Sequence, residues 1–344
     1  MQFSFREAEK KDNEEWNKLA LKSKLGQPWH LWEVGDLIAS DRGWKMRRFV
    51  CECDGQLIGI FPFLITPLSR LALIYRYLKK PYQPVTLFNQ LLAPFHANSH
   101  PMGSYGGPVI SQSYEIHEDI LKGFIQYIEQ VFTKEKILSR EILLSPITSN
   151  DKTIVQSFIA NGYKYKTIDY YVLNLSNPLD QIWRELDKKC RNEIGQGEKR
   201  GAEILEVFDK DGVEECYQLY LLTMQRQGKS APISRDLFSK LSMYLLKENL
   251  VCIYIAKYED IPIGSLSIIA LPSYALYWIT GFDHNYAWLR SQNILIWNAI
   301  KKLKEKGVSY LDFGAASPVP GIRHWKQSWA TDLLKTWYLY KKGF

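Results

Sequence analysis

The chain has 344 residues, and 46% of them are apolar, which is enough for two domains with separate hydrophobic cores. Its net charge of +7 allows an anionic substrate but excludes the strongly basic surface of a dedicated nucleic-acid-binding protein. The most apolar window, residues 57–68, contains two prolines and is shorter than the roughly 20 residues of a membrane helix. The five cysteines are irregularly spaced and no secretory signal precedes them, so we expect a soluble cytoplasmic protein with at most a peripheral membrane association.

The first half of the chain predicts alternating strands and helices. Asp54-Gly55 lies between two apolar runs, which is a strong signal for a hairpin over residues 47–65. Further strands are expected over residues 2–8, 70–77, 141–144 and 166–173, and helices after Asp12 and over residues 31–38, 113–132 and 150–159.

Residues 81–108 form a proline-rich and aromatic stretch that predicts a long irregular loop. A loop of this length in a compact domain is more often functional than accidental. It ends on Ser104-Tyr105-Gly106-Gly107-Pro108, where the paired glycines indicate either a tight turn before a strand or a close approach of another group to the backbone.

A helix is expected to start at Asn177, with Pro178 in its first turn. Its second part is basic and includes Lys188, Lys189 and Arg191. Two interpretations stay open for this part: a solvated helix face, or a contact with an anionic donor or acceptor. Gly195 and Gly197 weaken the end of the predicted helix.

The pattern of the first half then restarts. The sequence predicts a strand over residues 202–207, helices over 212–226 and 234–246, a hairpin over 250–271 that turns at Glu259-Asp260, and strands over 274–281 and 334–340. The chain therefore predicts two copies of one mixed α/β unit joined by a helix.

The most informative stretch is residues 277–326. A helix over residues 291–306 ends at Gly307, a residue that favours helix ends, and a short buried strand follows over 308–313. The small residues 314–318 come at the carboxyl end of this strand, where open α/β sheets place their ligands.

The ordered set Asp312-Phe313-Gly314, Gly321, Trp325-Lys326 and Trp329 resembles the FemAB-like branch of the GNAT acyltransferases. The resemblance covers most of the chain. It implies an α/β fold with mixed sheets, built as two tandem GNAT-like domains at residues 1–175 and 176–344, the second one starting with the joining helix.

Lys326 is the best catalytic candidate. Acyl transfer to an amine builds negative charge on the carbonyl oxygen, and a fixed cation aimed at that oxygen stabilises it. The resemblance implies the same role for the Trp325-Lys326 pair, and a surface lysine on a short helix is the alternative. Trp329 is expected to stack on Lys326 or on the ligand.

The remaining candidates would bind the substrate or act as a base. The substrate-binding candidates are Tyr105, Gly106, Gly107, Arg191, Gly314, Arg323 and Trp329. Asp283, His284 and Asp312 are the candidate bases, and deprotonation in solution is an equal alternative. We expect no metal site.

The candidate donor site is the turn before the helix at residue 291. In acyl-CoA-dependent relatives this turn carries glycines that let the pyrophosphate approach the backbone. Here Asn293 and Leu295 occupy the glycine places and are expected to obstruct that approach, so acyl-CoA would be bound differently or would not be the donor. Arg290, Ser291 and Asn293 are the donor-binding candidates. We expect no tightly bound cofactor, and acyl-CoA is the candidate co-substrate.

The resemblance implies transfer of an acyl group from an activated thioester, carried by CoA or a carrier protein, to an amine of a small polar, cell-envelope or exopolysaccharide precursor. Two alternatives stay open: an aminoacyl-tRNA-dependent enzyme of the peptidoglycan-bridge type, and a GNAT-fold binding protein without catalysis. DNA is not an expected partner, and the sequence leaves the oligomeric state open.

Overall fold

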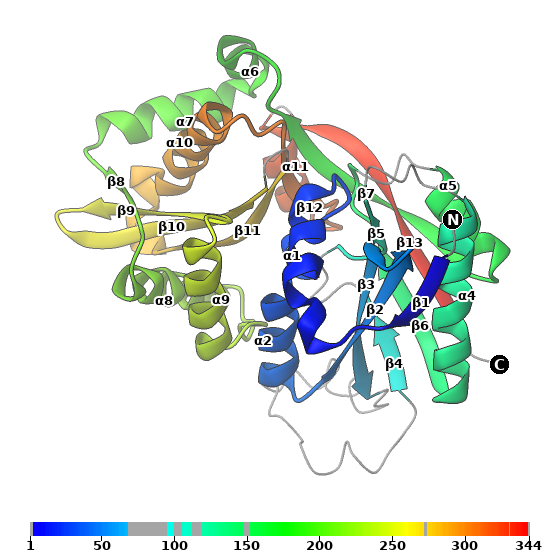
Figure 1. Cartoon of the computed structure of the whole chain (residues 1–344). Helices are drawn as coiled ribbons and strands as arrows, with labels where there is room; N and C mark the ends of the chain where they lie inside the picture. Colours follow the sequence, from blue (N-terminus) through cyan, green and yellow to red (C-terminus); the bar gives the residue numbers. More distant parts are fainter. Residues whose placement is uncertain are drawn as a thin grey trace. The chain divides into compact units, whose positions relative to one another are not determined.

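The computed structural model describes residues 3–67, 95–99, 105–111, 118–147, 152–271, 274–329 and 331–342. The chain divides into two compact units: unit 1 is residues 1–168 and 335–344, and unit 2 is residues 169–334 (Figure 1). The predicted boundary lay near residue 175 and placed the whole end of the chain in the second domain. The division differs because the last strand, β13 (Asp332–Lys342), pairs with β6 (Ile137–Leu143) of unit 1.

Unit 1 contains a mixed sheet. Its strands follow the order β1-β2-β3-β4-β6-β13, with β5 paired to β3, and β4 and β6 are parallel. The remaining strands are β1 (Phe3–Glu7), β2 (Lys45–Cys53), β3 (Gln56–Pro67), β4 (Phe95–Asn98) and β5 (Val109–Ile110). The helices are η1 (Lys10–Asp12), α1 (Asn13–Lys22), η2 (Pro28–His30), α2 (Trp32–Arg42), α4 (Glu118–Lys134) and α5 (Lys152–Ala160).

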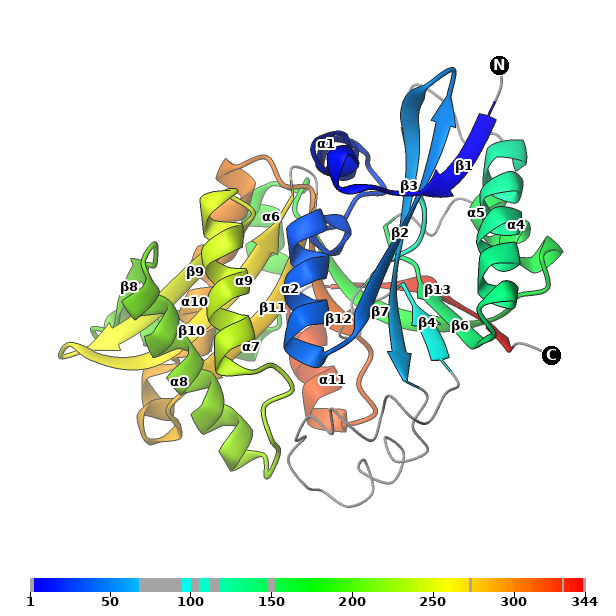
Figure 2. The same cartoon turned by 60° about the horizontal axis from the view of Figure 1, so that its bottom comes forward.

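The core of unit 1 lies between its sheet and α4. Phe124 and Phe132 of α4 are fully buried and pack against Phe49, Phe61 and Phe63 of β2 and β3. These rings meet mostly edge to face, an arrangement that adds to the free energy gained from burial. In Figure 2, α4 and α5 lie on one side of these strands, and α1 and α2 lie on the other.

The turn chemistry of unit 1 was predicted correctly, whereas part of the long loop was not. Asp54 and Gly55 have φ angles of 49° and 81°, as the predicted hairpin turn requires, and Cys53 pairs with Gln56. Within the predicted loop 81–108, however, β4 is a strand, because β3 and β6 both pair with it. The predicted strand 70–77 lies outside the described residues.

Unit 2 has the strand order β7-β12-β11-β10-β9-β8. Its strands are β7 (Lys164–Asn174, which enters unit 2 at residue 169), β8 (Glu203–Glu206), β9 (Val251–Tyr258), β10 (Ile261–Ala270), β11 (Tyr274–Phe282) and β12 (Tyr310–Ala315). Its helices are α6 (Leu179–Glu185), α7 (Lys188–Lys199), α8 (Lys210–Arg226), α9 (Arg235–Lys247), η4 (His284–Leu289), α10 (Ser291–Glu305) and α11 (Pro320–Gln327). Two mixed α/β units confirm the predicted fold class.

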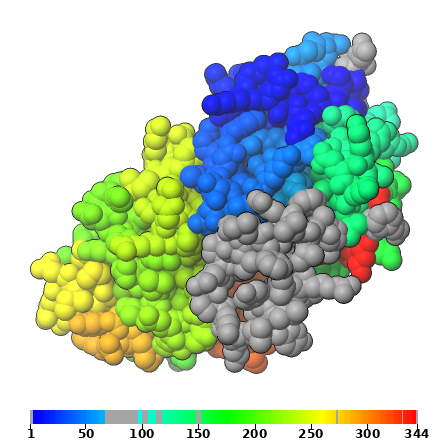
Figure 3. All heavy atoms as spheres, turned by 90° about the horizontal axis from the view of Figure 1, so that it is seen from below, coloured from blue at the N-terminus to red at the C-terminus, as the bar shows by residue number. Residues whose placement is uncertain are grey.

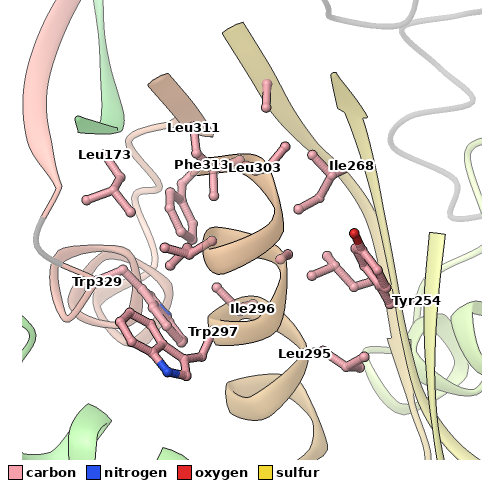
Figure 4. Packing of buried hydrophobic residues seen from close by; sticks show 14 of the residues in the cluster. Leu173, Tyr254, Ile268, Leu295, Ile296, Trp297, Leu303, Leu311, Phe313 and Trp329 are labelled. Atoms are coloured by element: carbon pink, nitrogen blue, oxygen red, sulfur yellow. The ribbon is translucent and has the colours of Figure 1, made fainter. Parts of the chain in front are cut away.

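Helices cover both faces of the unit 2 sheet. In Figure 1, α7 and α10 lie on one face and α8 and α9 on the other, and Figure 3 shows the outer surface of α8 and α9 in yellow-green. The core around α10 is shown in Figure 4, where Ile296 and Trp297 approach Trp329 and Phe313. Gly307, at φ 75°, ends α10 as predicted.

The predicted joining helix is in fact two helices. α6 ends before Leu186, and Asp187 starts α7 by accepting a hydrogen bond from the Lys189 N–H at 2.7 Å. α7 continues through Gly195 and Gly197, although these glycines weaken a helix in isolation. A Cβ on Gly197 would lie 2.6 Å from the Ile294 side chain, so this glycine allows α7 to pack closely on α10.

In the part of the chain that the structure describes, no helix combines the length and apolar character needed to cross a membrane.

Candidate active site

The candidate site lies where two parallel strands of unit 2 separate. β11 and β12 pair over three positions, from Tyr274 opposite Tyr310 to Leu276 opposite Asp312. β11 then continues to Phe282 and leads to α10, whereas β12 ends at Ala315 and leads to α11. The carboxyl ends of parallel strands are where α/β sheets place their ligands. The residues just past the last pair therefore lie where a ligand is expected.

Asp312, the last paired residue of β12, is fully buried. One carboxylate oxygen accepts a hydrogen bond from the Gly314 N–H at 2.6 Å, and the other accepts one from the Tyr274 hydroxyl at 2.6 Å. Both oxygens are thus engaged and shielded from solvent. This arrangement matches the turn-supporting role of Asp312 and gives no support to its use as a base.

Lys326 reaches the end of β12 from α11. Its ammonium donates a hydrogen bond to the Ala315 carbonyl at 2.8 Å, and it lies 3.4 Å from the point that a Cβ on Gly314 would occupy. Burial lowers the pKa of Lys326 below its usual value of 10.5, and the negative charge of Asp312 opposes this shift. An ammonium has three N–H donors, so two of them remain without a partner among the described residues.

Aromatic side chains surround this end of the sheet. The rings of Tyr277 and Phe313, the first residues past the last strand pair, stack at 5.6 Å and 17°. Trp325 of α11 meets both rings edge-on, at 5.7 Å and 5.8 Å. Trp325 is half-buried, and with Tyr277 and Phe313 it forms an aromatic cluster at the end of the sheet that the Lys326 ammonium also reaches.

Trp329 lies in the core rather than against Lys326. Its side chain is 0% exposed and its ring stacks on Phe313 at 6.3 Å and 20° (Figure 4). The indole N–H is buried and has no hydrogen-bond partner among the described residues. The expected stacking of Trp329 on Lys326 is therefore not what the structure shows, because Phe313 occupies the face of the indole.

The remaining candidates on α11 are exposed. Arg323 donates a hydrogen bond to the Ser317 carbonyl at 3.3 Å and otherwise faces solvent, as does His324. Val319 and Ile322 are exposed on the same segment. Arg323 is free to meet an anionic group, but the structure does not fix it in place for one.

Arg191 has a structural use in the described chain. Its guanidinium donates to the carbonyls of Trp183, Arg184 and Leu186, at the end of α6. The last carbonyls of a helix have no partner within the helix, and a cation there also interacts favourably with the helix dipole. Because the helix breaks between α6 and α7, the Arg191 guanidinium can bind these carbonyls of its own chain.

The donor turn differs from the expectation in one respect. Leu295 is fully buried in the core, so its bulk does not obstruct the start of α10. Asn293 donates to the Glu193 carboxylate at 3.3 Å, and Ser291 is buried against Gly264. Arg290 has a φ of 54° and lies 3.7 Å from Glu193. These donor-binding candidates are held mainly by contacts within unit 2.

Tyr105, Gly106 and Gly107 belong to unit 1, where they are packed tightly. Tyr105 is 2% exposed, and a Cβ on Gly106 would lie 1.3 Å from the Ser99 carbonyl oxygen. Ser99 accepts a hydrogen bond from the Gly107 N–H at 3.0 Å and also lines a small hollow with Trp29, Gly35, Met46, Pro62, Leu64 and Asn98. The paired glycines indicated that some group approaches the backbone closely. That group is the Ser99 backbone of the same chain.

His30, which the sequence did not single out, fixes the same segment. Its Nδ1 accepts a hydrogen bond from the Gln27 N–H at 2.9 Å, so Nε2 carries the hydrogen and donates to the Gly107 carbonyl at 3.1 Å. Burial lowers the pKa of His30 to about 4, which keeps the ring neutral.

Of the other two candidate bases, Asp283 has a structural role and His284 faces solvent. Asp283 starts η4 by accepting a hydrogen bond from the Asn285 N–H at 2.9 Å, and His284 is exposed. Within the described residues, no group of three or more His, Cys, Asp or Glu side chains is placed to hold a metal ion. Sequence reasoning missed Tyr274 and Tyr277, because their importance depends on the three-residue register between β11 and β12.

Comparisons with known proteins identify a similar family and similar folds. Residues 186–327 match the family model described as an acetyltransferase (GNAT) domain, which spans α7 to α11. A search of the curated proteins found no match.

Solved structures share the fold over the whole chain. FemX is 13% identical with a TM-score of 0.71, covering 97% of this chain and 96% of that chain. The C-terminal domain of a putative lysylphosphatidylglycerol synthetase from Agrobacterium fabrum is 11% identical with a TM-score of 0.60, covering 97% and 92%. A tandem GNAT protein from the clavulanic acid biosynthesis pathway is 10% identical with a TM-score of 0.54, covering 99% and 98%. The predicted tandem GNAT fold is thereby confirmed.

Proposed function

We propose, from the premise that this chain is a FemAB-like acyltransferase of the GNAT superfamily, that it transfers an acyl group from an activated thioester to an amine of a cell-envelope or other small polar precursor. The observation that carries the proposal is the Lys326 ammonium, partly withdrawn from water at the point where β11 and β12 separate.

In the proposed reaction the amine nitrogen attacks the thioester carbonyl. A C–N bond forms, the C–S bond breaks, the thiol leaves, and the amine loses a proton to solvent. Negative charge develops on the carbonyl oxygen during the attack, and two N–H donors of Lys326 are available to it. Withdrawal from water strengthens that interaction. The half-buried ring of Trp325 packs against Tyr277 and Phe313 at the same end of the sheet.

The donor is proposed to be acyl-CoA or another acyl thioester. GNAT acetyltransferase domains take acyl-CoA as co-substrate, and the burial of Leu295 removes one of the two objections raised by the sequence. The start of α10 presents backbone N–H groups, which suit a pyrophosphate. Arg290 lies at this start and, at 40% exposure, can approach an anion.

The acceptor is proposed from the resemblance and from one relative. A structural relative named as a putative lysylphosphatidylglycerol synthetase supports an acceptor from the cell envelope. The exposed Arg323 of α11 is the residue we propose to meet an anionic group of that acceptor.

The test is an assay of thiol release from acetyl-CoA and longer acyl-CoAs, run with a panel of amino sugars, UDP-amino sugars and amino acids, with product masses measured. We expect amine-dependent release of CoA and a product heavier by one acyl group. Consumption of aminoacyl-tRNA but of no thioester would favour the peptidoglycan-bridge alternative. Binding of donor and acceptor without any transfer would instead identify a non-catalytic protein and contradict the proposal.

A further inference from the structure

The buried carboxylate of Asp312 is linked to Lys326 through one turn of backbone. Asp312 holds the Gly314 N–H, and Gly314 has a φ of 84°, a conformation that L-residues adopt only at a cost. The next residue, Ala315, presents the carbonyl that accepts from Lys326. The position of the ammonium therefore depends on a turn that Asp312 supports.

A second strand fixes Asp312 in turn. The Tyr274 hydroxyl, at the first paired position of β11, donates to the second carboxylate oxygen at 2.6 Å. Tyr274 is 4% exposed and Asp312 is 0% exposed, so water does not compete for this bond. The carboxylate is thus tied to both strands at the point where they separate.

We propose that Asp312 is a positioning residue for Lys326: it supports the Gly314 turn that presents the Ala315 carbonyl, and its negative charge retains the half-buried ammonium at the end of β12. This inference rests on the proposed function of Lys326 and adds to it the device that keeps Lys326 charged and in place.

The pH at which Lys326 loses its proton depends on the charged groups around it. From β12 the charge is that of Asp312, which favours the ammonium. From β11, Tyr274 acts through its hydrogen bond to the Asp312 carboxylate. α11 itself carries Arg323 and His324, which are exposed. A half-buried cation whose neighbouring anion is removed loses its proton more readily.

The experiment is competitive labelling of the full-length protein with acetic anhydride over a range of pH, with each lysine quantified by peptide mass spectrometry. Only the neutral amine reacts, so the labelling curve gives the midpoint at which Lys326 loses its proton. In Asp312→Asn, which keeps the size of the side chain, we expect this midpoint to fall by about one pH unit or more. Lys304, bound to the carbonyls of Leu175 and Asn177, serves as the internal control and should not move.

Two further variants separate charge from folding. Tyr274→Phe removes a hydrogen bond from the same carboxylate but leaves its charge, so the midpoint of Lys326 should stay near that of the wild type. Gly314→Ala places a Cβ 3.4 Å from the ammonium at a positive φ, and it should lower turnover at least tenfold while Asp312 is intact. The Gly314→Ala variant also provides a test of the inference if Asp312→Asn does not fold.

An unchanged Lys326 midpoint in folded Asp312→Asn, or full turnover in Gly314→Ala, would overturn the inference. The proposed function fails in a different way, namely when a folded Lys326→Met protein keeps its turnover. That result would leave the labelling shift intact, so the two failures are distinguishable.

Discussion

Replacing Lys326 with methionine is expected to lower turnover by about 100-fold or more while leaving the fold unchanged. Removing one donor from an oxyanion site costs roughly 3–4 kcal/mol of transition-state stabilisation. Methionine keeps much of the aliphatic length of lysine but carries no donor and no charge. Because burial already lowers the pKa of Lys326, the folded state gains little from its charge, and the melting temperature should change little.

The measurement is the initial rate with the best donor and acceptor pair, together with a thermal melt. Lys302→Met is the matched control, because Lys302 lies in the same unit on the exposed face of α10 and pairs with Glu305 at 2.8 Å. The control should keep wild-type turnover. A Lys326→Met protein as active as the control would remove Lys326 from the mechanism.

Replacing Trp329 with alanine is expected to cost about 3–5 kcal/mol of stability, the range seen when a large aromatic side chain is removed from a core. Trp329 is 0% exposed and stacks on Phe313, which also stacks on Tyr277. Loss of the indole would therefore leave a cavity behind the residues that line the site. Chemical denaturation measures the change in the free energy of unfolding.

Two comparison variants make this prediction specific. Trp329→Phe should cost far less than Trp329→Ala, because the indole N–H already lacks a partner among the described residues and its removal breaks no hydrogen bond. Trp325→Ala should lose more activity than stability, since Trp325 is half-buried and borders the ammonium. If Trp329→Ala unfolds at the same denaturant concentration as the wild type, the core position of Trp329 is wrong.

Local chemistry allowed much of the fold to be predicted. Asp54-Gly55 and Glu259-Asp260 adopt the positive φ angles that their hairpin turns require, and Gly307 ends α10. Each of these features depends on a few neighbouring residues. The helix and strand periodicities likewise gave the repeated α/β pattern, which the comparisons confirm as a tandem GNAT fold.

Features that depend on distant pairing were not predictable from the sequence. β4 was expected to be loop, because its four residues become a strand only between β3 and β6. The return of β13 to unit 1 depends on its pairing with β6. The break at Leu186 is set by Asp187, whose capping role was hidden within an otherwise helical pattern.

The candidate site likewise combines features that local sequence predicts with features that depend on distant residues. Lys326 and Trp325 were singled out by their chemistry and by the family resemblance, and the structure places both at the end of β12. The hydrogen bond between Tyr274 and Asp312 joins residues 38 positions apart, so no local sequence pattern predicts it. Arg191 was a substrate-binding candidate, with a solvated helix face as the alternative, but the break between α6 and α7 brings the carbonyls of α6 within its reach.

The pH dependence of wild-type turnover, compared with the labelling midpoint of Lys326, tests the central claim most directly. The lowered pKa means that the ammonium is lost at a lower pH than for an exposed lysine, whose usual value is 10.5. If that ammonium stabilises the carbonyl oxygen, turnover should fall as pH rises through the midpoint measured for Lys326. Turnover that stays level while Lys326 loses its proton would contradict the account.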